Sequence, residues 1–410
     1  MRIFFYITLS VLSLVSQSIG ANTALTFQRA LALAYQNNPE LQAELDKANA
    51  MKGMFMQSKL YPNPQLAFTA ENIGGSGQYS GYESAETTIA LTQPIPLGHR
   101  LQYLQKMTYA DYQTSLARIK LNKFQLFNAV GTAYIDALYA DQWHRVTKKL
   151  VKVNVDIVSA IQRRVDAGAG GVLDLRLAQV RLGEARIQKM KAERDALMLR
   201  ARLARFLGGK LRVDNQLTDE GLKHTRWTWP KLLKKIANSP LLIEKHRVVQ
   251  AKRAAIVSAK KDVWPDLNIQ LGGRHFSDDG SNAAVVSAYS QVPVYNRNQG
   301  TIYAAQAQYT QALHELKGAQ LEVRQNLYAA YLQAEQGLFE TNLVTESLLP
   351  LARQSLQVAR DGYQMGRYTY IELSTALSTL FDEERHYQQA HAEYHKALLT
   401  VAGLLGINVY

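Results

Sequence analysis

The chain has 410 residues, of which 47% are apolar and 20% are charged, and its formal net charge at pH 7 is +13. This apolar fraction excludes a wholly disordered protein. Because there is no cysteine, disulfide frameworks, thiolate metal sites, cysteine nucleophiles and lipid-modified N-terminal cysteines are excluded as well. The length suggests two or three globular domains, and the positive charge suggests a nucleic-acid partner.

The N-terminus has the pattern of a secretory signal peptide. Arg2 precedes an apolar stretch over residues 3–15, and small and polar residues then lead to Gly20 and Ala21. We predict a signal peptide over residues 1–20, with an uncleaved membrane anchor as the alternative. No later segment reaches the roughly 20 apolar residues that a membrane-spanning helix requires. The sequence therefore predicts an exported protein without an inner-membrane helix, and export argues against a nucleic-acid partner.

Within each half of the chain, the period of the apolar residues and the proline positions indicate the elements. A short helix over 26–36 ends at Asn37-Asn38-Pro39, and a second helix over 40–59 stops before Pro62. Alternating side chains then predict strands over 65–71 and 85–95, which form a first hairpin at about 65–95 around a Gly- and Ser-rich loop. The same pattern predicts a second hairpin at about 266–294.

A very long helix follows each hairpin, over about 98–164 and about 299–362. At 1.5 Å per residue, a helix of this length spans roughly 100 Å. A glycine turn then leads into a returning helix of about 35 residues, whose apolar residues step by three and four as in helices packed lengthwise. Because the returning helix is shorter than its partner, we expect the helix over 40–59 to stack end to end with it.

Landmarks of the first half recur about 198 residues later. The Asn38-Pro39 junction corresponds to Ser239-Pro240, Gly168 corresponds to Gly366, and Gly208 corresponds to Gly406. Such matches in the same order predict a duplicated unit. We expect a first repeat over residues 21–208, an inter-repeat linker over 209–228 and a second repeat over 229–410.

The strands have the length of tilted membrane strands, and four strands cannot close a membrane-spanning sheet alone. Several chains would then share one barrel: two chains give eight strands, and three chains give twelve strands with a lumen. The alternative is a pair of solvent-exposed hairpins in a helical scaffold.

The signal peptide, duplicated unit, Asn-Pro junction, strand pair, long helix and returning helix together resemble the TolC-like outer-membrane efflux factors. The repeated Gly-x5-Asp/Glu-Leu turn carries most of the local likeness, as Gly168 to Asp174-Leu175 and Gly366 to Glu372-Leu373. The resemblance implies a mainly α fold with a small β part. In detail, it implies a long α-helical barrel and four strands per chain in a trimeric, 12-stranded transmembrane β-barrel. The implied location is the bacterial outer membrane, with the helical tunnel in the periplasm.

The resemblance also implies a homotrimer that contacts outer-membrane lipid, a periplasmic adaptor (a membrane fusion protein) and an inner-membrane pump. Length and the compact C-terminus favour the heavy-metal, CzcC-like branch, which serves resistance-nodulation-division (RND) pumps and conducts heavy-metal cations. Many members of related branches carry a lipid-modified cysteine, which this chain lacks. The alternative function is a periplasmic coiled-coil adaptor or scaffold of an export system.

The turns after the long helices would form the periplasmic end of the tunnel, where the adaptor docks. The candidate docking residues are Ala167, Gly168, Gly170, Gly171, Leu173, Met365, Gly366, Arg367, Tyr368 and Tyr370. The carboxylates that could ring the aperture and favour cations are Asp166, Asp174, Asp361 and Glu372, although each could instead be solvated or cap a helix.

Two histidines, His391 and His395, have a spacing that can bind a metal on one helix. His391 also lies on the apolar seam of its helix, which favours a packed histidine over a ligand. The sequence contains no phosphate-binding Gly-x4-Gly-Lys-Ser/Thr loop and no signature of a nucleophile and base. We therefore expect no enzymatic activity, no cofactor and no resident metal.

Overall fold

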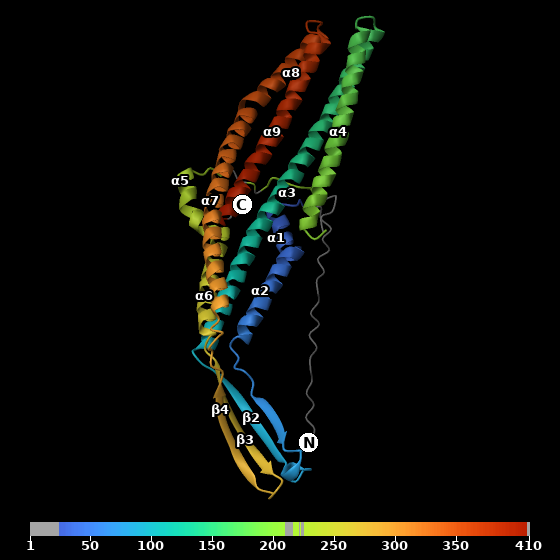
Figure 1. Ribbon diagram of the computed structural model, residues 1–410. Coiled ribbons are helices and arrows are strands. Elements are labelled where there is room, and N and C mark those ends of the chain that lie inside the picture. Colours follow the sequence, from blue (N-terminus) through green and yellow to red (C-terminus); the bar gives the residue numbers. More distant parts are fainter. Residues whose placement is uncertain (1–23, 210–215, 221, 223–224, 408–410) are drawn as a thin grey trace, which may run out of the picture.

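The computed structural model describes residues 24–209, 216–220, 222 and 225–407. The predicted signal peptide and parts of the predicted linker lie outside the described residues. The molecule is elongated, with a four-stranded sheet at one end and two helical turns at the other (Figure 1). The predicted fold class, mainly α with a small β part, is confirmed.

The first half contains α1 (Phe27–Asn37), α2 (Pro39–Gln57), β1 (Gln65–Glu71), β2 (Glu86–Pro96), α3 (Arg100–Asp166) and α4 (Val172–Phe206), with a 3-10 turn η1 (Gly77–Tyr79) between the strands. The Asn-Pro junction separates α1 from α2. Asn38 accepts a hydrogen bond from the Leu41 backbone N–H at 3.0 Å, while Pro39 occupies the first turn of α2, where no donor is needed.

The second half repeats this order. It contains α5 (Trp229–Lys235), η2 (Ile236–Asn238), α6 (Pro240–Lys261), β3 (Asp266–Phe276), β4 (Asn282–Ser290), α7 (Gln299–Leu343), η3 (Val344–Leu348), α8 (Leu349–Gln364) and α9 (Tyr370–Leu405). Each half thus runs from two short helices through a strand pair to a long helical hairpin (Figure 1).

The second long helix is not continuous, which corrects the prediction of one helix over 299–362. The five residues of η3 form a π-helix, which separates α7 from α8. Pro350 has no N–H to donate to the carbonyl four residues earlier, at Glu346, so the regular hydrogen-bond ladder is broken there. The first long helix has no proline, and α3 is unbroken over 67 residues.

The four strands form one antiparallel sheet in the order β1-β2-β3-β4, so the two hairpins join through β2 and β3. The sheet has one apolar face, on which Phe68 lies opposite Ile89 and Leu91 lies opposite Leu271. These side chains are exposed in the single chain. The other face is polar and includes Thr88, Thr92, Asn268, Gln270 and Arg274, as the alternation predicts.

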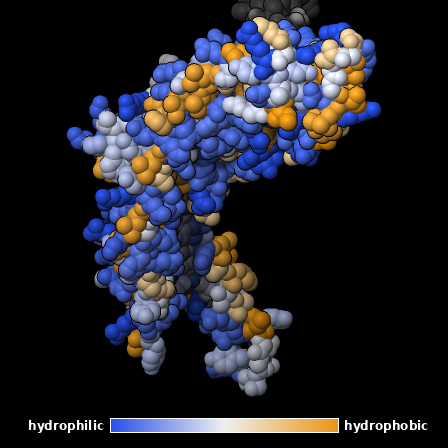
Figure 2. Space-filling view, turned by 90° about the horizontal axis from the view of Figure 1, so that it is seen from above, coloured by the Kyte–Doolittle hydropathy of each residue, from blue (hydrophilic) through white to orange (hydrophobic). Residues whose placement is uncertain are grey.

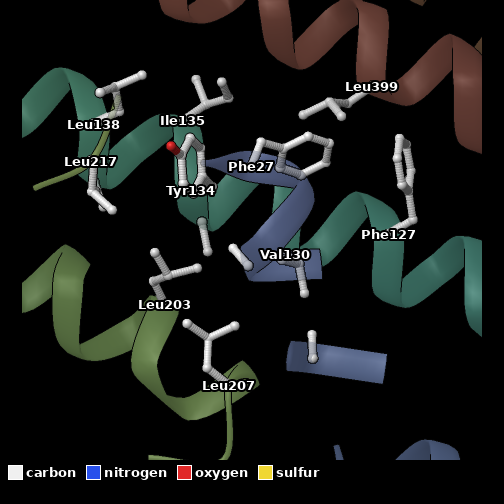
Figure 3. Packing of buried hydrophobic residues seen from close by; sticks show 14 of the residues in the cluster. Phe27, Phe127, Val130, Tyr134, Ile135, Leu138, Leu203, Leu207, Leu217 and Leu399 are labelled. Atoms are coloured by element: carbon white, nitrogen blue, oxygen red, sulfur yellow. The ribbon is translucent and has the colours of Figure 1, made fainter. Parts of the chain in front are cut away.

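The main core lies midway along the molecule, where α1 packs against α3, α4 and α9. Figure 3 shows Phe27 of α1 facing Tyr134 of α3, with Leu203 of α4 and Leu399 of α9 around them. The Tyr134 hydroxyl shares its one proton between the backbone carbonyls of Leu25 and Thr218, each 2.6 Å away, which secures the start of α1 and the segment after α4. Burial raises the pKa of this phenol.

The expected end-to-end stacking of helices is present in both halves. Gly208 after α4 has φ of +70°, and a Cβ there would lie 2.9 Å from Cβ of Asn37, at the α1–α2 junction. Gly406 after α9 has φ of +65°, and a Cβ there would lie 3.0 Å from Cγ of Pro240, at the start of α6. A left-handed backbone and a close approach both require glycine at these positions.

Among the described residues, no helix is both long enough and apolar enough to cross a membrane. Seen from above, the surface is mostly hydrophilic, and its apolar residues gather in several separate groups (Figure 2).

Candidate functional site

The candidate site is the pair of tight turns at the end of the long helices, one between α3 and α4 and one between α8 and α9. Gly168 has φ of +70° and Gly366 has φ of +74°, and a Cβ on either would meet no atom within 4 Å. These glycines are therefore needed for their backbone conformation and not for close packing. The two turns are structural equivalents, 198 positions apart.

Most of the predicted docking residues lie on the surface of these turns. Leu173 is 70% exposed, Met365 is 64% exposed and Tyr368 is 41% exposed, an unusual exposure for large apolar side chains. The remaining exposed members are Ala167, Gly168, Gly171, Gly366 and Arg367, while Gly170 is half-buried.

Tyr370 differs from the other predicted docking residues because it is buried. It begins α9 and packs with Ile161, Leu175 and Tyr363 in an apolar cluster between the two hairpins. Burial raises the pKa of its phenol. Since a buried side chain cannot form part of a docking surface, Tyr370 is removed from that set.

The four predicted aperture carboxylates have different surroundings. Asp166 is exposed and accepts from the Gln162 amide at 2.8 Å, and Asp361 accepts from the Gln357 amide at 2.9 Å. Asp174 is half-buried in the first turn of α4. All four lie at the tip end of the molecule.

Glu372 acts as a helix cap. It accepts from the backbone N–H of Thr369 at 2.6 Å, while the Thr369 hydroxyl accepts from the Glu372 N–H, which completes a capping box at the start of α9. The carboxyl of Glu372 accepts from both the N–H and the hydroxyl of Thr369, and these hydrogen bonds lower its pKa, so it is ionised at neutral pH.

Arg164 links the two hairpin tips, a role that the sequence analysis did not identify. Its guanidinium donates to the Tyr363 carbonyl at 2.7 Å and lies 5.0 Å from the centre of the Tyr363 ring. It also donates to the Ala169 carbonyl in the turn after α3, at 3.4 Å. The sequence does contain one signal for this contact: Arg164 and Tyr363 are 199 residues apart, and a repeat near 198 residues places equivalent positions of the two tips close together.

A cavity of about 280 Å³ lies just behind this link, between α3 and the α8–α9 hairpin. Ile157 and Leu356 provide apolar walls, and Arg164, Arg353 and Arg360 contribute guanidinium groups. The two hairpins therefore pack incompletely behind the tip, although the cluster around Tyr370 holds them together at the end.

His391 and His395, whose spacing made them weak candidates for metal ligands, are buried among aromatic rings. His391 hydrogen-bonds the Tyr139 hydroxyl and stacks on Tyr387, with ring centres 5.3 Å apart. The ring of His395 lies 4.7 Å from that of His391. Within the described ranges, no group of three or more His, Asp or Glu residues could hold a metal ion. The histidines thus belong to the packing of α3 against α9.

A duplicated long-helix hairpin attached to a small sheet with one exposed apolar face indicates a membrane-attached protein with a long helical extension. The outer membrane efflux protein family model matches residues 30–209 and 233–407, so the chain belongs to that family. This family consists of transport channels and not of enzymes.

The relatives agree in sequence and in fold. The chain is 24% identical to the cobalt-zinc-cadmium resistance protein CzcC of Cupriavidus metallidurans over 93% of this chain and 90% of that protein. It is 24% identical to the nickel and cobalt resistance protein CnrC of the same organism, over 72% of this chain and 69% of that protein. Its fold matches a crystal structure of CusC with a TM-score of 0.80 and 16% identity, over 93% of this chain and 92% of that one.

The protein is thus an outer-membrane efflux channel component with a periplasmic helical tunnel. The adaptor or scaffold function that the sequence left as an alternative is not supported by these matches.

Proposed function

We propose that three copies of the chain assemble into one channel, with β1–β4 of each copy forming a twelve-stranded barrel in the outer membrane. The observation that carries this proposal is the sheet: it has one exposed apolar face, and β1 and β4 are edges without partners in the described part of the chain. Lipid cannot satisfy the hydrogen-bonding groups of an open edge, so the edges of neighbouring copies must pair. Twelve strands enclose a lumen, which eight strands do not.

The oligomer is tested by electrophoresis of outer-membrane fractions with and without heating. We expect a band at the trimer position in the unheated sample that converts to the monomer on heating. A monomer in both samples, or a dimer after chemical crosslinking, would contradict the proposal.

The helical tips are the proposed docking site for a periplasmic adaptor that connects the channel to an inner-membrane pump of the RND type. The exposed Leu173 and Met365 support this assignment, because both lie at the far end of the molecule from the sheet. Substituting both by Asp should abolish crosslinking to the adaptor and leave the trimer intact. An unchanged crosslinking yield would show that the adaptor binds elsewhere.

The proposed substrates are divalent heavy-metal cations, and the match over 93% of this chain to a cobalt-zinc-cadmium resistance protein supports this. Cells that lack the channel should accumulate cobalt, zinc or cadmium and regain export when the gene is restored. Retention of an organic dye without any change in metal content would refute the metal substrate but leave the channel function intact.

The carboxylates near the tips are the proposed aperture residues. Asp174→Ala and Glu372→Ala should loosen the closed end and raise single-channel conductance in planar bilayers. Glu372→Ala also removes the cap of α9, so Glu372→Gln, which can still accept a hydrogen bond, separates charge from capping. Unchanged conductance and cation preference in all three variants would exclude an aperture role for Asp174 and Glu372.

A further inference from the structure

The two halves of the chain differ strongly in the charge of one equivalent pair of helices. The segment from α1 to α2, Phe27–Gln57, contains three Lys or Arg and three acidic residues. The corresponding segment from α5 to α6, Trp229–Lys261, contains nine Lys or Arg and one acidic residue, Glu244, which is buried. Much of the chain's excess positive charge is therefore concentrated on α5 and α6.

Some of these basic residues have structural partners within the chain. The Lys245 ammonium lies 2.9 Å from the Glu315 carboxylate of α7, and this contact lowers the pKa of Glu315. Lys252 donates to Gln308 of α7 at 2.9 Å. Both side chains hold α6 against α7.

Six others are exposed, and within the described part of the chain none of them forms a salt bridge. We call this group the basic belt: Lys231, Lys234, Lys235, Arg247, Arg253 and Lys260. Arg247 donates to a neutral side chain, that of Gln250. The belt is thus a run of positive charge without compensating carboxylates among the described residues.

The part of the belt on α6 stays exposed when copies of the chain associate side by side. α6 packs against α3 on one side and α7 on the other, and α2 packs against the far side of α3. The outer members of this row of helices are therefore α2 and α7, and a neighbouring copy would pack against one of them. α6 lies inside the row, so its exposed surface does not face a neighbouring copy.

Arg253 and Lys260 of the belt also lie on the outside of the tube. On the opposite side of α6, Ala255, Ser258 and Ala259 line a groove of about 500 Å³ between α3, α6 and α7. At 100° per residue, Arg253 and Lys260 point away from that groove.

The groove is continuous with the polar face of the sheet. It shares Arg100, Asp262 and Asn298 with a cavity whose other lining residues include Asn268 and Tyr289, both on the polar face. Arg253 and Lys260 are therefore on the same side as the apolar, outward face of the sheet.

We propose that the basic belt binds the carboxylate-rich polymer of the bacterial cell wall and so tethers the channel to it. With 22 residues, α6 extends roughly 33 Å from the sheet, and α5 lies beyond its far end (Figure 1). The headgroup layer of one membrane leaflet is only about 5–8 Å thick, so lipid reaches the Lys260 end and not α5. An extended polyanion can contact belt residues on both α5 and α6, and each neutralised charge adds to a salt-dependent affinity.

The test measures co-sedimentation of the purified full-length protein with purified cell-wall sacculi. The belt variant is the triple substitution Lys234→Gln, Arg253→Gln and Lys260→Gln. Its matched control is Arg176→Gln, Arg186→Gln and Lys191→Gln, which removes from α4 three exposed basic residues that form no salt bridge within the described residues. Both triples change the net charge equally.

We expect the wild type and the control to bind at low salt and the belt variant to bind about tenfold more weakly. Amidating the carboxyl groups of the sacculi should remove binding of the wild type. Absence of wild-type binding, or an equal loss in the two triples, would overturn the proposal, since an equal loss reflects net charge alone.

Vesicles containing an anionic phospholipid are the second arm of the test. If the belt triple weakens vesicle binding but not sacculus binding, the partner is lipid and the proposal is wrong. The inference uses only the outer-membrane location, and the belt triple should keep wild-type conductance in bilayers. A protein that conducts in bilayers but does not bind sacculi would refute cell-wall binding by the basic belt and leave the channel function unaffected.

Discussion

At the residue scale, the contact between Arg164 and Tyr363 decides how the two hairpins meet. The guanidinium reaches a backbone carbonyl of the other hairpin, so its hydrogen bond depends on the relative position of the tips and not on the identity of a partner side chain. Arg164 is half-buried, and screening by solvent reduces such a charged hydrogen bond to about 1 kcal/mol.

Arg164→Met keeps the apolar stem of the side chain and removes the hydrogen bonds. A loss of about 1 kcal/mol shifts the ratio of separated to joined tips by about fivefold, so single-channel conductance in planar bilayers should rise. The matched control is Arg163→Met, at the exposed neighbouring position. Equal conductance of the two variants would show that the link does not hold the tips together.

At the element scale, the returning helices end against the shorter helices of their own half: α4 ends at the α1–α2 junction, and α9 ends at the start of α6. A glycine makes each of these two junctions possible. Gly208 and Gly406 combine a left-handed backbone with contact to the next helix, whereas Gly168 and Gly366 have the backbone requirement alone. The same residue type therefore has different physical roles at the two ends of α4.

Gly208→Ala should destabilise the protein more than Gly168→Ala. Both place an alanine in the left-handed region, at about 1–2 kcal/mol, but only the new methyl group at position 208 would also press on Asn37. The comparison is made by thermal unfolding of the two variants in detergent. Equal midpoints would indicate that the α4 and α1–α2 ends are not in tight contact.

The π-helix η3 is the main difference between the long helices of the two halves. Pro350→Ala supplies an N–H for the Glu346 carbonyl, so the segment over 344–350 should become α-helical and its amides should exchange more slowly with deuterium. Pro39→Ala is the control, because Pro39 occupies the first turn of α2, where an N–H has no partner. Unchanged exchange in Pro350→Ala would assign the π-helix to tertiary packing.

At the scale of the whole molecule, the sheet anchors the protein and the helices span the space behind it. The apolar face of the sheet is exposed in the chain, and its exposure is explained by the outer membrane. The surface of the helices is mostly hydrophilic (Figure 2), although large apolar side chains such as Met190 of α4 and Phe339 of α7 are exposed on it.

Phe68→Arg places a charge on the apolar face and should prevent stable insertion in the outer membrane, at about 2–4 kcal/mol near the bilayer midplane. Thr69→Arg, one residue away on the polar face, should insert normally. Outer-membrane fractionation of the two variants measures the difference. Normal insertion of Phe68→Arg would mean that this face does not contact lipid.

The sequence by itself determined the order of the elements and the duplication, because helix and strand periods, proline stops and glycine turns are local properties. It also located the tips, since Gly168 and Gly366 mark reversals wherever the helices lie. It did not predict the π-helix, although Pro350 provided a local signal for an interruption.

Only the tertiary structure decided which faces of these elements meet. The pairing of β2 with β3, the burial of Tyr370 and the Arg164–Tyr363 link join residues from different halves of the chain. The outward position of Arg253 and Lys260 likewise depends on which neighbours cover α6. Local patterns cannot specify these contacts, because they depend on how distant segments pack against one another.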